Sequence, residues 1–237
     1  MPMPSFDTIV IGGGTNGQAC AAKLQSSGRK VLVLEARPEA GGAACGSEFA
    51  PGYRSPGLAH LLYLLDPRVE KGMALAQHGF AYAGPALTST AVSATGDHLV
   101  LDRAYGATIA GSLAAADRDA WSRLRAQLLG FANILVPFKT ITPPRIAKSA
   151  GNDYLKLAKL GLAARMLGKD QFRELLRMLL INVHDVLNDD LTDARLKGLV
   201  AFDTTLGSWL GPRSPNSLIL LLNRLAGQAA GEAAAVA

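Results

Sequence analysis

The sequence predicts an α/β fold in which a Rossmann-like βαβ unit with parallel strands is followed by a mainly helical segment. Three observations support this prediction. Two short apolar runs, Thr8–Ile11 and Val31–Glu35, are separated by a single helical stretch, Thr15–Ser26. Three consecutive glycines stand between the first run and the helix. Beyond Asp102 the apolar residues recur at helical spacing instead of alternating as in a strand.

The first strand and helix are indicated by their composition and their ends. Thr8–Ile11 is apolar and rich in β-branched residues, and Gly28 follows the helical stretch at the position where helices favour glycine. Val31–Glu35 reads "VLVLE", the pattern of a buried strand. Two such strands joined through one helix predict parallel pairing with a right-handed crossover.

The glycines between strand and helix form the spacing Gly12-x-Gly14-x-x-Gly17. In this context the first glycine permits a tight turn, the second lets a pyrophosphate approach the backbone, and the third lets helix and strand pack closely. Glu35 follows Gly17 by eighteen residues and can accept hydrogen bonds from an adenosine ribose, whereas it would repel a 2′-phosphate. The pattern therefore predicts a dinucleotide site that disfavours NADP. The simpler alternative is a glycine turn with an unrelated acidic residue on the surface nearby.

The residues after the acid, "EARPEAGG", resemble the extended fingerprint of the FAD-dependent amine oxidase and phytoene desaturase superfamily. The chain is most similar to its phytoene desaturase-like branch, which includes pyridine nucleotide-disulfide oxidoreductase domain-containing protein 2, and the likeness continues through "GGAACGSEFAPGYRSPGLAH". Where amine oxidases often carry Arg after the paired glycines, this chain has Ala43. The resemblance implies FAD as cofactor, with these site residues: Gly12, Gly14, Gly17, Glu35, Arg37, Gly41 and Gly42.

The resemblance implies an oxidoreductase that transfers a hydride from an apolar or amine-type organic substrate to flavin. Because members of the superfamily are longer, the chain resembles their N-terminal half. The alternative is therefore a truncated, non-catalytic fragment or interaction module that retains FAD weakly or not at all. A protein that binds NAD without flavin is a third interpretation, which the paired Gly41 and Gly42 disfavour.

The cysteines and histidines offer only weak catalytic candidates. A C-x₄-C dithiol is excluded because the positions five residues from Cys45 hold Ala40 and Ala50, so Cys45 is interpreted as a packing residue. Cys20 is expected on the packed face of the first helix. His60 could orient substrate or flavin, although a hydrogen-bonded structural histidine is the simpler interpretation. No metal-ligand spacing is found.

The charge of +5 is local, because residues 121–177 carry eleven basic and three acidic side chains. A solvated face is the first interpretation of this basic region, and peripheral contact with anionic lipid the second. Nucleic-acid binding is not expected, because aromatic residues are sparse and no recognised module is present. With no secretory signal and no long apolar run, a cytoplasmic location with candidate membrane association is expected, as is a small-molecule substrate; homo-oligomerisation is left open.

The predicted domains are an FAD-binding segment, residues 1–86, and a partial substrate domain, residues 87–237. The second begins with a hairpin over Ser93–Leu101 that turns at Gly96-Asp97 and continues as amphipathic helices. In the glycine- and proline-rich stretch Asp203–Ser217, two interpretations of Trp209 are open. The stretch either lines a site or is an ordinary turn with the indole plugged into the core.

Overall fold

The computed structural model describes residues 4–57, 61–62, 65–84, 87–103, 105–139, 141–145, 151–228 and 234–236. Contacts within the chain divide it into two units. Unit 1 comprises Met1–Leu87 together with Ala233–Ala237, and unit 2 comprises Thr88–Glu232. The functional division that the sequence suggested at residues 86 and 87 stays a prediction.

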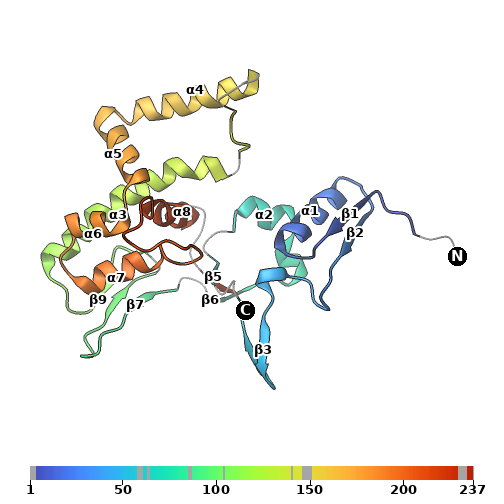
Figure 1. The fold of residues 1–237 in the computed structure, drawn as a ribbon, viewed down its shortest axis with the longest axis horizontal. Helices are drawn as coiled ribbons and strands as arrows, with labels where there is room; N and C mark the ends of the chain where they lie inside the picture. Colours follow the sequence, from blue (N-terminus) through green and yellow to red (C-terminus); the bar gives the residue numbers. More distant parts are fainter. Residues whose placement is uncertain are drawn as a thin grey trace. The chain divides into compact units, whose positions relative to one another are not determined.

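Unit 1 contains the predicted parallel βαβ arrangement (Figure 1). Strand β1 (Thr8–Ile11) and helix α1 (Thr15–Ser26) have the predicted bounds, and β2 (Val31–Leu34) ends one residue early. The strands pair in parallel, with Thr8 opposite Val31 and Ile11 opposite Leu34. Gly28 adopts a φ of +85°, which lets the chain leave the helix and start β2 after two further residues.

The strands of this pair are more exposed than the sequence predicted. Ile11 is 86% exposed and Leu34 47% exposed, so the expectation of a buried β2 is wrong for the described chain. The reason is that the sheet has two strands and α1 is the main element packed on it. The expectation for Cys20 is also wrong, because its side chain is exposed, while α1 buries Ala21.

The rest of unit 1 consists of short elements. Strands β3 and β4 form an antiparallel hairpin, and β10 lies between β5 and β6, antiparallel to both. The elements are η1 (Gly42–Ala44), β3 (Ser47–Ala50), β4 (Tyr53–Ser55), β5 (Leu61–Leu62), α2 (Pro67–Gly72), η2 (Leu75–His78), β6 (Tyr82–Gly84) and β10 (Ala234–Val236).

Unit 2 is mainly helical, as the sequence predicted, and begins with a small antiparallel sheet of order β7-β8-β9. The hairpin is present with Gly96 in its turn, but its first strand is Ser89–Ala91 and residue 93 lies in the loop. The elements are β7 (Ser89–Ala91), β8 (Leu99–Leu101), β9 (Ile109–Ala110), α3 (Ala115–Leu135), η3 (Val136–Lys139), α4 (Gly151–Met166), α5 (Lys169–Leu180), α6 (Val183–Asp190), α7 (Ala194–Phe202) and α8 (Leu218–Gln228).

The core of unit 2 lies between α3 and α8. Trp121 is 1% exposed, and its indole N–H donates to the Gly106 carbonyl over 3.0 Å. Leu124 and Leu128 continue the same face of α3, and α8 contributes Leu221, Leu222 and Leu225. Trp209 takes no part in this core because it is fully exposed, so the interpretation of its indole as a core plug is wrong.

A buried carboxylate joins the start of α3 to the loop before α7. Asp117 is 3% exposed and accepts hydrogen bonds from the Thr192 backbone N–H (2.7 Å), the Thr192 hydroxyl (2.6 Å) and the Asp193 backbone N–H (3.1 Å). Asp193 in turn caps α7 by accepting from the N–H groups of Arg195 and Leu196. One side chain on α3 thus positions the cap of another helix.

Candidate dinucleotide-binding site

The turn between β1 and α1 depends on two glycines. Gly12 has a φ of +100°, a conformation that side chains rarely tolerate, and its N–H donates to the Leu34 carbonyl over 2.8 Å. A Cβ on Gly17 would lie 1.9 Å from the Gly12 carbonyl oxygen. The first glycine therefore shapes the turn, and the third lets α1 begin directly against it.

The N-terminus of α1 is suited to an anion. Gly14 occupies the N-cap position and has no side chain to bond the first-turn N–H groups, and that turn contains no acidic residue. Unpaired N–H groups and the helix dipole together favour a phosphate at such an end. Gln18 steadies the turn by donating to the Gly13 carbonyl over 2.7 Å.

Glu35 lies where β2 ends and points back to the glycine turn. Its Oε2 accepts from the Gly13 backbone N–H over 2.6 Å, and its Oε1 accepts from the Arg37 backbone N–H over 3.0 Å. These hydrogen bonds, from Arg37 first and Gly13 second, lower the pKa of Glu35 below its ordinary value. The carboxylate is therefore ionised at neutral pH, and each oxygen keeps capacity for a further hydrogen bond.

The second glycine pair lies against the first glycine turn. Gly41 forms an isolated parallel bridge with Gly14, and its N–H donates to the Gly13 carbonyl over 2.8 Å. Gly42 has a φ of +59°, and a Cβ there would lie 3.0 Å from the Gly14 Cα. The structure therefore brings the two glycine motifs together as one backbone surface, in which a side chain on Gly42 would crowd the Gly14 backbone.

Cys45 and Arg37 border this surface. The Cys45 thiol is half-buried, donates to the Ala40 carbonyl over 3.2 Å and lies 2.6 Å from the position a Cβ of Gly41 would take, and its interpretation as a packing residue stays a prediction. Arg37 is exposed, and its backbone N–H is the group that contacts Glu35. His60, the weak catalytic candidate, lies outside the described residues.

Sequence reasoning missed one residue of this site, Gly13. Its N–H binds Glu35 and its carbonyl accepts from both Gly41 and Gln18. A Cβ at this position would meet Ala40 and Glu35 at about 3.1 Å. The signal was the uninterrupted run of three glycines, because the spacing pattern leaves the middle one unspecified.

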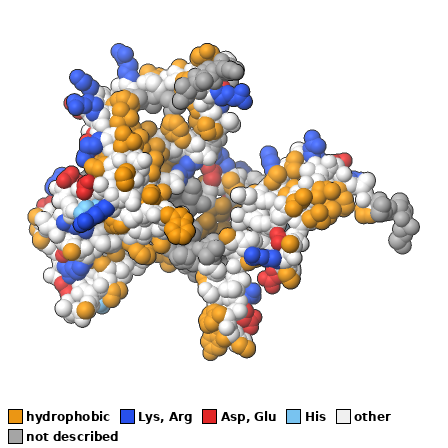
Figure 2. Space-filling view, in the orientation of Figure 1, with side chains coloured by type: hydrophobic (Ala, Val, Ile, Leu, Met, Phe, Trp, Pro, Cys, Tyr) orange, Lys and Arg blue, Asp and Glu red, His pale blue; other side chains and the backbone are white. Residues whose placement is uncertain are grey.

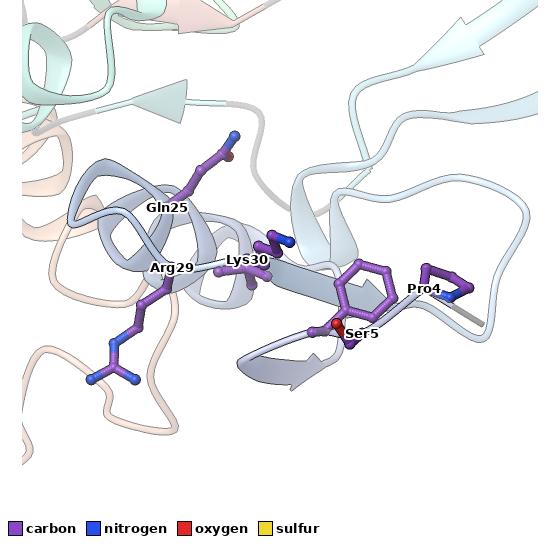
Figure 3. Close-up of a pocket in the computed structure, with 7 residues that line it drawn as sticks. Pro4, Ser5, Gln25, Arg29 and Lys30 are labelled. Atoms are coloured by element: carbon purple, nitrogen blue, oxygen red, sulfur yellow. The ribbon is translucent and has the colours of Figure 1, made fainter. Parts of the chain in front are cut away.

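A pocket of about 480 Å³ lies elsewhere in unit 1, lined by Pro4, Ser5, Phe6, Gln25, Arg29, Lys30 and Val31 (Figure 3). These residues surround the amino ends of β1 and β2, opposite the carboxyl ends at which parallel sheets bind ligands. Figure 3 also shows Gln25 and Arg29 pointing in different directions. The pocket is therefore separate from the glycine surface and has no set of converging polar groups.

Neither a metal site nor a membrane span is found among the described residues. No group of three or more His, Cys, Asp or Glu side chains in the described ranges is arranged to hold a metal ion. Within the same part of the chain, none of the helices combines the length and apolar character that crossing a bilayer requires.

Fold and site together define a Rossmann-like unit, with a glycine turn of the kind found in dinucleotide-binding domains, followed by a mainly helical segment. In agreement, residues 10–74 match the family model of the NAD(P)-binding Rossmann-like domain.

The chain is homologous over 96% of its length to pyridine nucleotide-disulfide oxidoreductase domain-containing protein 2, with 28% identity to the rat (Rattus norvegicus) protein and 26% to the mouse (Mus musculus) protein. It spans 42% of the length of these relatives. It is also 35% identical to one of the subunits of limonene dehydrogenase from Castellaniella defragrans, over 40% of this chain and 17% of that protein.

Solved amine oxidases share the fold. Putrescine oxidase aligns with 96% of this chain and 45% of its own chain, with a TM-score of 0.52 and 15% identity. Cyclohexylamine oxidase from Brevibacterium oxydans aligns with 92% of this chain and 41% of its own, with a TM-score of 0.50 and 20% identity. The predicted resemblance to the FAD amine oxidase-type fold is thus confirmed at the level of fold.

Replacing Gly17 with Ala is expected to disrupt the site, because the added methyl would overlap the Gly12 carbonyl. We expect a loss of about 1–3 kcal/mol in the free energy of unfolding of unit 1, measured by urea denaturation, together with weaker binding of ADP. The matched control is Gly130→Ala in α3, where a Cβ meets nothing within 4 Å. If Gly17→Ala matched this control in stability and binding, the tight packing of the turn would be disproved.

Proposed function

We propose that this chain binds the adenosine diphosphate half of FAD and belongs to an oxidoreductase that oxidises an apolar or amine-type organic substrate. The observation that supports this most is the paired Gly41 and Gly42 lying against the Gly13-Gly14 turn beside an ionised Glu35. Bound FAD would supply a two-electron acceptor for hydride from the substrate.

The residues fit this group in three ways. The N-terminus of α1 presents N–H groups for the pyrophosphate, with no acidic side chain in its first turn. The facing glycines present no side chain beside this helix end, and Gly42 packs against Gly14 so closely that a Cβ there would lie 3.0 Å from the Gly14 Cα. Glu35 can accept hydrogen bonds from the ribose hydroxyls. Arg37 and the paired glycines complete the proposed FAD set, which remains Gly12, Gly14, Gly17, Glu35, Arg37, Gly41 and Gly42.

A non-catalytic interaction module is the second candidate, and the exposure of Ile11 and Leu34 favours it. Apolar strand residues of a parallel sheet are normally covered on both faces. A unit with one face of its sheet open could retain FAD weakly and serve chiefly to bind another protein surface.

Ligand competition distinguishes the two candidates. We expect the purified chain to retain a flavin absorption band after incubation with FAD and desalting, and ADP to displace that flavin. FMN is the matched control, because it lacks the adenosine half and should not be retained. Failure to retain FAD together with no binding of ADP would refute the proposed function and leave the interaction module.

A further inference from the structure

Helix α4 carries apolar side chains in solvent. Leu155 is 64% exposed, Leu162 59% and Met166 81%, and their spacing of seven and four residues places them on one helical face. Lys159 lies within the same row, also exposed. Helix α5 is the main element that packs against α4 in the described chain, and Figure 1 shows α4 extending away from the other helices of unit 2.

Helix α5 extends this arrangement beside its buried face. Leu175 and Met178 are buried, and the adjoining side of the helix exposes Phe172 (37%), Leu176 (45%) and Leu180 (69%) at spacings of four. An amphipathic helix of a globular domain normally presents polar residues on its outer face. Here the apolar stripe of α5 continues into solvent through Phe172, Leu176 and Leu180, and the exposed Lys169 and Arg173 lie along it.

The cations on these two helices are largely uncompensated. Lys159, Arg165, Lys169 and Arg173 are exposed and form no ion pair with any residue that the structure describes. The acids of the two helices are already engaged in part, since Asp153 lies 3.9 Å from Lys156 and Glu174 bonds Arg177. Figure 2 shows Lys and Arg side chains grouped over α4 and α5, with hydrophobic side chains between them.

We propose that α4 and α5 dock on an anionic lipid surface, with the exposed apolar side chains entering the interface and Lys159, Arg165, Lys169 and Arg173 meeting acidic headgroups. Apolar residues interspersed with cations are the combination that holds an amphipathic helix in the plane of a bilayer surface. A second copy of the chain fits less well, because a two-fold contact would bring the same cations against themselves. A face that only contacts water would normally carry polar residues at the positions of Leu155, Leu162 and Leu180.

Vesicle sedimentation with the full chain tests this proposal and does not depend on flavin. We expect the chain to sediment with phosphatidylcholine vesicles containing phosphatidylglycerol, to stay in solution with phosphatidylcholine alone, and to be released by high salt. Lys159→Glu combined with Lys169→Glu should weaken binding by at least about 20-fold, since each cation near the surface contributes about fivefold. Leu162→Gln combined with Met166→Gln should also weaken vesicle binding, and by the same factor at low and at high salt.

The matched control is Lys23→Glu with Arg29→Glu, two exposed cations on and after α1. It should bind as the unchanged chain does. Light scattering measures whether the chain is a monomer or a dimer in solution. The proposal would be overturned if the chain did not sediment with the anionic vesicles, or if the control variant lost vesicle binding to the same extent. It would also be overturned if the chain bound no vesicles and formed a dimer that Leu162→Gln and Met166→Gln dissociate.

Discussion

Replacing Glu35 with Ala is expected to weaken binding of FAD or ADP by about 10- to 100-fold, the usual effect of removing a charged hydrogen-bond acceptor. In this chain the carboxylate is held by the N–H groups of Gly13 and Arg37, 2.6 Å and 3.0 Å away. Its position is therefore fixed before ligand binds, and its lowered pKa keeps it ionised. Isothermal titration with ADP measures the effect.

The matched control for Glu35 is Glu39→Ala, which removes an exposed carboxylate from the same loop. We expect no change in its affinity for ADP. A ligand lacking the ribose hydroxyls, 2′,3′-dideoxy-ADP, separates direct contact from distortion of the turn. The unchanged chain should bind 2′,3′-dideoxy-ADP more weakly than it binds ADP. Glu35→Ala should bind the two ligands with equal affinity. If both proteins distinguished the two ligands equally, Glu35 would not be the residue that accepts from the ribose.

Protonation gives a second check on Glu35. Because hydrogen bonds lower its pKa, the ionised acceptor should persist as the pH falls to its ordinary pKa of about 4.3 and be lost only below it. The ratio of the ADP affinities of the unchanged chain and Glu35→Ala, in which the titration of the ADP phosphate cancels, should therefore stay constant from neutral pH down to that value.

The sequence predicted the βαβ unit closely because its signals are local. The bounds of β1 and α1 follow from the apolar run, the glycines and Gly28, all of which act within a few residues. Spacing also suggested that Glu35 and the first glycine motif share a site, and the resemblance to flavoproteins added the paired Gly41 and Gly42. Neither could show that the Glu35 carboxylate contacts Gly13, because that contact depends on how the loop after β2 folds back.

Exposure was harder to predict, because it depends on which elements pack together. Cys20 and Trp209 are residue types that proteins usually bury, yet both are exposed, since the elements that surround them pack through other side chains.

The alanine-rich tail shows that secondary structure can also depend on distant partners. Alanine favours helix, but Ala234–Val236 forms a strand because β5 and β6 offer backbone partners on either side.

Asp117 shows the same limitation and gives the largest expected effect on stability. The sequence marks it only as an acid at a helix start, whereas its partners Thr192 and Asp193 lie 75 and 76 residues further along. Asp117→Asn should cost about 2–4 kcal/mol in the free energy of unfolding of unit 2. Oδ2 accepts from both the Thr192 hydroxyl and the Asp193 N–H, and an amide cannot accept at both oxygen positions.

The pH dependence of unfolding distinguishes the contribution of the Asp117 charge from that of its hydrogen-bond pattern alone. Burial raises the pKa of Asp117, but the hydrogen bonds from Thr192 and Asp193 together outweigh it and hold the pKa below its ordinary value. The stabilisation is therefore fully present above about pH 3.9, the pKa expected in the unfolded chain, and lost as the pH falls through the lower folded pKa. Urea denaturation should show a constant gap between the unchanged chain and Asp117→Asn near neutral pH, narrowing below about pH 4. Asp119→Asn, an exposed acid on the same helix, should change stability little at any pH. A gap that persisted unchanged into acid would mean that Asp117 acts through its hydrogen-bond pattern and not through its charge.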